Sequence, residues 1–117
     1  PWPPAPTAAS LGRGTWTFLH TLAAYYPERP TPAEQTRMRS FLGTFAEVYP
    51  CGSCAAHMQA AIQPPAAADA DAADTVGPPA TESRAALSHW MCQLHNEVNV
   101  RLEKPVFDCT RVLQRWR

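Results

Sequence analysis

The sequence predicts an all-α fold, a four-helix bundle followed by a short fifth helix. Apolar residues recur at three- and four-residue spacing in successive segments, as in amphipathic helices that bury one face. Prolines stand between these segments and mark their ends, whereas no segment alternates convincingly as a strand would. A chain of 117 residues, 45% of them apolar, is long enough for one domain with a modest core.

The N-terminal part is expected to contain an arm and the first helix. Residues 1–10 are rich in Pro and Ala and predict a loose arm ahead of the domain proper at 11–117. A helical pattern then runs over 13–26, with apolar or aromatic residues on two sides, and stops at Pro27. The first helix is therefore expected to be covered on both faces.

The second helix has the clearest start in the sequence. Thr31 can cap it, Pro32 suits the first helical position, and Glu34 completes a capping box. Its apolar stripe continues until Pro50, which cannot extend it. Directly afterwards, a short amphipathic pattern begins at Cys51, so the third helix is expected to open at that cysteine.

The C-terminal half contains one loop and two further helices. Residues 64–80 lack periodicity and large apolar side chains, which predicts a mobile or disordered surface insertion. A long helix is predicted over 82–102, and Asp108 can cap a short last helix. The long helix is expected to turn these residues to the core: Leu87, Trp90 or Met91, Leu94, Val98 and Leu102.

Charge and hydropathy argue against two classes of partner. Ten Lys and Arg residues balance ten Asp and Glu residues, so no overall charge favours nucleic acid. No apolar run approaches the roughly eighteen residues that a membrane-spanning helix needs. We therefore expect neither a nucleic-acid partner nor a membrane partner.

The four cysteines suggest two different tasks. Cys51 and Cys54 form a CxxC motif in the first turn of a predicted helix, where free N–H groups and the helix dipole favour a thiolate. Cys92 and Cys109 are far enough apart to link two elements. A zinc site remains an alternative, because Cys92 and His95 could complete a Cys3His set with the CxxC pair, leaving Cys109 over; an inert cysteine pair is a third possibility.

A second face of the predicted long helix is polar but uncharged. Cys92, His95, Asn96 and Asn99 follow one another at helical spacing, whereas a solvated face would carry Lys, Glu or Arg. The pattern indicates hydrogen bonding to a cofactor, with mutual satisfaction inside the core as the alternative. If the CxxC disulfide is passed on to a substrate, it has to be regenerated by a two-electron acceptor such as a flavin. Planar walls and edge contacts for it could come from Trp16, His20, Tyr25, His95, Asn96, Asn99 and Trp116.

Several motifs resemble one known family. They are Gly12-Arg13, Trp16, Leu19-His20, Tyr49-Pro50-Cys51-Gly52-Ser53-Cys54, Cys92-Gln93-Leu94-His95-Asn96-Glu97-Val98-Asn99, Lys104-Pro105, Phe107-Asp108-Cys109 and Arg115-Trp116. Through them, residues 11–63 and 81–117 resemble the Erv/ALR family of FAD-dependent sulfhydryl oxidases. The resemblance implies FAD held at the mouth of a four-helix bundle, a short fifth helix, and a homodimer formed through the first two helices.

The resemblance also implies a role for each site residue. Cys51 would be attacked by substrate, Cys54 would be the flavin-proximal thiolate, and Cys92 with Cys109 would form a structural bridge. No metal is implied. The implied FAD contacts are Gly12, Arg13, Gly14, Trp16, His20, Tyr25, Cys92, His95, Asn96, Val98, Asn99, Lys104, Arg115 and Trp116.

The implied function is the oxidation of protein thiols to disulfides. Electrons would pass from a thiol-bearing protein, such as an import oxidoreductase, through the CxxC pair and FAD to oxygen or cytochrome c. The resemblance favours the mitochondrial intermembrane space, with the secretory pathway as the alternative. The chain departs from the family in the insertion at 64–80, in having no shuttle cysteine pair besides its four cysteines, and in His57, which either biases the Cys54 thiolate or is simply exposed.

Overall fold

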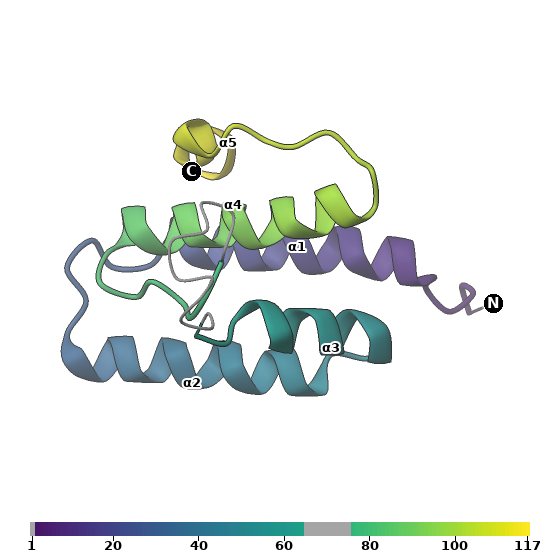
Figure 1. The fold of residues 1–117 in the computed structure, drawn as a ribbon, viewed down its shortest axis with the longest axis horizontal. Coiled ribbons are helices and arrows are strands. Elements are labelled where there is room, and N and C mark those ends of the chain that lie inside the picture. The colour runs from purple at the N-terminus through teal and green to yellow at the C-terminus, as the bar shows by residue number, and fades with distance from the viewer. Residues whose placement is uncertain (1, 65–75) are drawn as a thin grey trace.

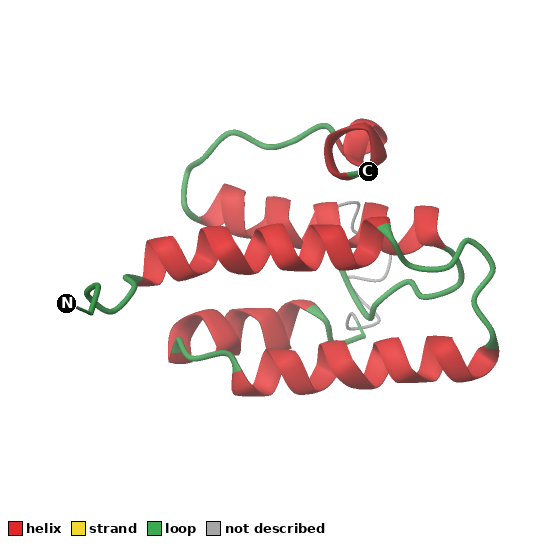
Figure 2. Cartoon of the chain, turned by 180° about the vertical axis from the view of Figure 1, so that it is seen from behind, coloured by secondary structure: helices red, strands yellow, loops and turns green. Residues whose placement is uncertain are grey.

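The computed structural model describes residues 2–64 and 76–117, and over these ranges it is helical without strands. Two antiparallel helix pairs make up the bundle (Figures 1 and 2). Helix α1 (Ala8–Ala24) packs mainly on α4 (Arg84–Arg101), and α2 (Pro32–Val48) mainly on α3 (Gly52–Ala61). A 3-10 turn, η2 (Cys109–Arg111), leads into α5 (Val112–Trp116), which lies on the outer side of the α1/α4 pair. The predicted four helices and short fifth are confirmed.

The first helix begins at Ala8 rather than at residue 13. Thr7 is its N-cap, and its side-chain oxygen accepts a hydrogen bond from the Ser10 backbone N–H at 3.1 Å. A capped start followed by alanines, the best helix formers, favours helix despite the prolines before it. Residues 8–10, expected in the loose arm, are therefore helical. Residues 2–6 have no regular structure and are exposed.

The starts of α2 and α3 agree with the sequence prediction. The Glu34 backbone N–H donates to the Thr31 side chain at 3.1 Å, and the Thr31 backbone N–H donates to the Glu34 carboxylate at 2.9 Å, completing the capping box. Helix α3 has Cys51 as its N-cap residue. The two helices meet through a turn of only a few residues, so α3 folds directly back along α2.

The end of the expected insertion is part of the packed structure. Gly77 is buried, its carbonyl accepts from the Trp90 indole N–H at 3.1 Å, and its own N–H donates to the Ala61 carbonyl at 3.0 Å. The φ of Gly77 is 71°, a conformation in which a side chain would be strained. Residues 76–80 are a loop without regular secondary structure, as expected, but burial of Gly77 shows that this end of the segment is packed and not a free surface insertion. Of the rest, Pro64 is exposed and residues 65–75 lie outside the described ranges.

Thr81 joins the two helix pairs at one end of the bundle. Its carbonyl accepts from the Tyr26 hydroxyl at 2.8 Å, and its hydroxyl accepts from the Arg39 guanidinium at 2.7 Å. Around this connection lies the main hydrophobic core, made of Leu19, Ala23, Tyr26, Leu42, Leu87, Trp90, Met91 and Leu94. The core thus uses the C-terminal half of α1 and the N-terminal half of α4.

The last turns of α4 leave the core. Val98 is only half-buried and Leu102 is 54% exposed, although both were expected on the core face. Both residues line the cavity described below, because this half of α4 faces an open space instead of a neighbouring helix. In the described part of the chain, no helix is long and apolar enough to cross a bilayer.

Candidate active site

The CxxC motif is a disulfide at the N-terminus of α3. Cys51 and Cys54 are bonded, with their Cα atoms 5.2 Å apart. The Cys51 carbonyl accepts the first helical hydrogen bond from the Ala55 N–H at 2.8 Å, so Cys54 lies within the first turn. Free N–H groups of that turn stabilise negative charge on sulfur when the bond opens. The location suits reversible opening of the disulfide.

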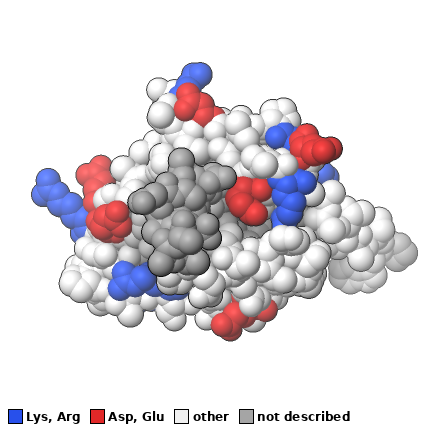
Figure 3. All heavy atoms as spheres, viewed as in Figure 1, with Lys and Arg blue, Asp and Glu red and all other residues white. Residues whose placement is uncertain are grey.

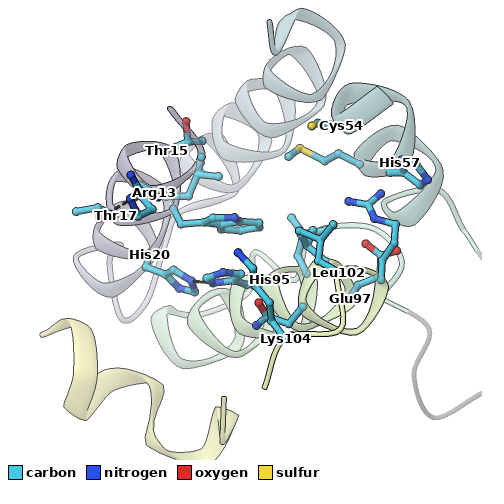
Figure 4. A pocket seen from close by; sticks show the side chains of 18 of the residues that line it. Arg13, Thr15, Thr17, His20, Cys54, His57, His95, Glu97, Leu102 and Lys104 are labelled. Carbon is cyan, nitrogen blue, oxygen red and sulfur yellow. Dashed lines mark hydrogen bonds between the residues drawn. The ribbon is translucent and has the colours of Figure 1, made fainter. Parts of the chain in front are cut away.

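A cavity of about 850 Å³ lies beside this disulfide, and Cys54, but not Cys51, belongs to its wall. Its other walls come from the N-terminal half of α1, the C-terminal half of α4 and the end of α5. Figure 4 shows Cys54 on one side of this space and His20 and His95 on the other. Eleven of the expected cofactor residues line it: Gly12, Arg13, Trp16, His20, Cys92, His95, Val98, Asn99, Lys104, Arg115 and Trp116.

Aromatic and imidazole rings are layered along one side of the cavity. Trp16 of α1 stacks on His95 of α4, with ring centroids 4.0 Å apart and planes 6° apart. His20 stacks on Trp116 of α5 at 4.6 Å and 7°. The two imidazoles are joined by a hydrogen bond of 2.8 Å between His20 Nε2 and His95 Nδ1. Three helices therefore contribute to one ring-lined wall, in which the two stacked pairs are tilted, with 39° between the two imidazole planes.

Both imidazoles of this wall are kept neutral by their surroundings. Burial, followed by repulsion between a His20 imidazolium and the neighbouring His95 and Arg115, lowers the pKa of His20 to about 4. Burial, and then the charge of Lys104, lowers the pKa of His95. The His20 Nδ1 atom is buried and has no hydrogen-bond partner among the described residues. A bound molecule could supply that partner.

Acidification is expected to destabilise the fold through His20. The pKa of His20 is 6.5 before and about 4 after folding, so the unfolded chain binds more protons between these values. The free energy of unfolding therefore falls as pH drops from 6.5 towards 4. At about 1.4 kcal/mol per pKa unit, and after a reduction for solvent screening, protonation of His20 lowers the free energy of unfolding by about 2 kcal/mol over this pH range.

Urea unfolding at about pH 7 and about pH 4.5 would measure this effect. A His20→Gln variant should lose less stability on acidification than the parent protein, because glutamine does not titrate. His89→Gln, at an exposed position on α4, serves as the matched control. Equal losses for the parent and His20→Gln would contradict the assignment.

Three expected cofactor residues do not line the cavity. Gly14 is exposed, and Tyr25 is 58% exposed beneath the Arg117 guanidinium. Asn96 instead holds the chain that follows α4: its Nδ2 donates to the Phe107 carbonyl at 2.8 Å, and its Oδ1 accepts from the Phe107 N–H at 2.9 Å. For Asn96, the structure thus favours the alternative in which polar groups of this face satisfy the protein itself.

The second disulfide stands next to this clamp. Cys92 of α4 is bonded to Cys109, whose Cα lies 5.6 Å away, and Asn96 Nδ2 lies 3.3 Å from the Cys109 sulfur. Together they hold η2 and α5 against α4, which positions Arg115 and Trp116 at the cavity. The pairing implied by the resemblance is present.

The two disulfides remove the basis of the zinc alternative. Zinc requires thiolates, whereas all four cysteines are bonded in pairs. Over 2–64 and 76–117, no three His, Cys, Asp or Glu side chains converge as metal ligands. The Cys51, Cys54, Cys92 and His95 set is therefore unsupported.

The sequence analysis missed several wall residues. Tyr49 lines the cavity and donates its hydroxyl hydrogen to Thr15, another wall residue, at 3.3 Å, which ties the CxxC turn to α1. Glu97 and Arg101 line it from α4. Their i, i+4 spacing puts them on one face of the helix, and this was the signal in the sequence that could have identified them. The other missed wall residues are Ala8, Ala9, Thr17, Leu19, Ser53, Met58, Leu94, Leu102 and Phe107, whereas His57, which the sequence analysis singled out, also lines the cavity.

Comparisons with known proteins agree with this geometry. The model of the Erv1 / Alr family matches residues 13–117. The chain is 44% identical over 108 residues to the mitochondrial FAD-linked sulfhydryl oxidase erv1 of Schizosaccharomyces pombe, which covers 92% of this chain and 54% of that protein. It spans about half the length of the curated relatives it matches.

Two solved structures share its fold. The yeast Erv1 core has a TM-score of 0.83 and 38% identity over 100% of this chain and 89% of that chain. The FAD binding domain of Erv1 from Saccharomyces cerevisiae has a TM-score of 0.78 and 38% identity over 96% and 95%. Since the family match includes both disulfides and the three helices that bear the layered rings, this chain belongs to the Erv1/Alr family.

Proposed function

We propose that this chain is the catalytic domain of an FAD-dependent sulfhydryl oxidase that forms disulfides in protein substrates. The observation that carries the proposal is the position of Cys54, one half of a disulfide at a helix N-terminus and part of the wall of a large ring-lined cavity. A relative in Schizosaccharomyces pombe is named a mitochondrial FAD-linked sulfhydryl oxidase. A redox disulfide beside a cofactor cavity is the arrangement such an enzyme needs.

The cavity suits FAD in size and lining. Its volume of about 850 Å³ falls in the usual range of ligand sites. Trp16, Trp116 and the two imidazoles offer flat surfaces for ring systems, while Arg13, Lys104 and Arg115 offer charge to a diphosphate. The unpartnered His20 Nδ1 supplies a polar contact. When bound, FAD would accept two electrons and pass them to oxygen or cytochrome c.

The two cysteines divide the thiol chemistry. A substrate thiolate attacks Cys51, which does not belong to the cavity wall, and Cys54 leaves as a thiolate within the cavity. The free N–H groups at the start of α3 stabilise that thiolate. A second substrate thiol then resolves the mixed disulfide. Substrate therefore approaches from outside, and Cys54 delivers electrons inward.

Exposed aromatic side chains on α1 and α2 support the expected homodimer. Phe18 is 51% exposed and Phe41 41% exposed, and their rings meet edge-on with centroids 6.3 Å apart. Apolar surface of this kind is stabilised by burial against a second copy. Acidic and basic groups are interspersed on the face in Figure 3, in line with a protein substrate rather than a nucleic acid.

A mitochondrial location, more finely the intermembrane space, is the favoured compartment, with the secretory pathway as the alternative. Two relatives, from Schizosaccharomyces pombe and Saccharomyces cerevisiae, carry the word mitochondrial in their names. Disulfide-forming enzymes require a compartment where disulfides persist. The thiol-bearing partner is expected to be an import oxidoreductase or a similar protein.

Visible absorption and oxygen uptake test the proposed function. The purified protein should show flavin bands, and a dithiol should then drive oxygen consumption with formation of hydrogen peroxide. Supplying cytochrome c under anaerobic conditions distinguishes the two acceptors. A protein that stays colourless after incubation with FAD, and consumes no oxygen, would exclude the proposal.

A further inference from the structure

His57 shares the cavity wall with Cys54 but was not among the expected cofactor contacts. It stands three residues after Cys54 on α3, a spacing that puts both on neighbouring positions of one helix face. Figure 4 shows the two side chains at the same side of the cavity, with Glu97 of α4 opposite. The imidazole and the sulfur that becomes a thiolate therefore line the same side of the cavity.

One hydrogen bond determines which His57 nitrogen can take up a proton. Nδ1 lies 2.7 Å from the Ser53 backbone carbonyl oxygen, and a carbonyl oxygen only accepts. In the neutral ring Nδ1 therefore carries the hydrogen, and the lone pair is on Nε2. Because His57 is also exposed to solvent, Nε2 can exchange protons with water. The ring is held in place while its basic atom remains free.

The charges around this part of the cavity are of both signs. Glu97 and Arg101 line the wall opposite α3, and each has a buried side-chain atom, Glu97 Oε2 and Arg101 Nη1, that finds no hydrogen-bond partner in the described part of the chain. Arg13 of α1 and Tyr49, next to the end of α2, also line the cavity, while His95 and Lys104 line its far side. Glu47 is a further acidic group on α2, the helix that packs on α3.

We propose that His57 is a positioning residue that stabilises the Cys54 thiolate during disulfide exchange. The catalytic part of this proposal rests on the proposed function. A substrate thiolate attacks the Cys51 sulfur, a new S–S bond forms there, and the Cys51–Cys54 bond breaks. The electron pair of the broken bond stays on Cys54. The proton that the substrate thiol gave up reaches His57 Nε2 through water, and the resulting imidazolium balances the new thiolate charge.

Alkylation of a single thiol tests the proposal without substrate or oxygen. A Cys51→Ser variant leaves Cys54 as the only free thiol while Cys92 and Cys109 stay paired. Its rate of reaction with iodoacetamide is measured against pH, as purified, in three backgrounds: unchanged, His57→Gln, and His89→Gln as the control on an exposed α4 position.

We expect His57→Gln to move the half-point of Cys54 alkylation up by about one pH unit, and so to slow alkylation at low pH by roughly tenfold. His89→Gln should leave the profile unchanged, and His57→Lys, which keeps a positive charge, should restore most of it. Coincident profiles for His57→Gln and its parent would overturn the proposal. Since no turnover is measured, this result is independent of whether the protein proves to be a thiol oxidase.

Discussion

A Cys54→Ser variant is expected to lose thiol-driven oxygen consumption by at least roughly a thousandfold while it keeps its flavin colour. Serine cannot form the disulfide with Cys51, so an attacking thiol finds no sulfur to displace and no electron pair enters the cavity. The substitution replaces sulfur by a slightly smaller oxygen at one point of the wall. The layered rings formed by Trp16, His20, His95 and Trp116 remain unchanged.

The measurements for this variant are oxygen uptake with a dithiol and a visible spectrum of the same sample. Gly52→Ala is a useful control within the motif, because a methyl group there would meet no atom within 4 Å. It should bind flavin and turn over within a few-fold of the parent. Undiminished turnover by Cys54→Ser would show that electrons bypass the motif, and loss of both colour and fold would point to a structural effect.

Removing the second disulfide should produce the largest loss of stability. The bonded residues Cys92 and Cys109 are seventeen positions apart, and the chain-entropy model assigns about 3 kcal/mol to a loop of this length. A Cys109→Ser variant should therefore melt roughly 10 °C lower than the parent. It should also bind flavin more weakly, because the bridge holds Arg115 and Trp116 against the cavity.

Thermal unfolding followed by circular dichroism measures this loss, and released flavin fluorescence measures the second effect. Cys92 is 1% exposed and would be left as a buried thiol, so the double variant Cys92→Ala, Cys109→Ser controls for exchange with the CxxC pair. Both variants should retain detectable oxidase activity with added FAD. An inactive protein with the parent's melting temperature would assign the pair to the chemistry.

The helix starts that could be predicted from the sequence are those that neighbouring residues alone determine. The capping box at Thr31 and the helix start at Cys51 depend on neighbouring residues alone, and both are present. The start of α1 was misplaced, because the prolines before Thr7 obscured a capping residue followed by two alanines. Burial of Gly77 depends on an indole thirteen residues later, and a glycine shows no such partner in sequence.

The wall of the candidate site was only partly predictable for a related reason. The family resemblance implied the eleven expected residues that line the cavity, and helical spacing alone had placed Cys92, His95 and Asn99 of these on one face. Spacing does not distinguish a carboxamide that faces a cofactor from one that binds a loop, and Asn96 binds the backbone of Phe107. Tyr49 lies in the cavity wall, where its hydroxyl group donates a hydrogen bond to Thr15 of α1. Neither segment of the sequence indicates this tertiary contact by itself.

The placement of the hydrophobic core in one half of the bundle has a consequence for how the protein is maintained. Near Thr81 the two helix pairs pack against one another, whereas at the other end of the bundle they line the cavity. A molecule bound there would substitute for missing core and add RT ln(1 + [L]/Kd) to the free energy of unfolding. Under the proposed function, the concentration of FAD would then determine how much of the protein is folded and so escapes proteolysis. The abundance of the enzyme would thereby follow the supply of its cofactor by mass action.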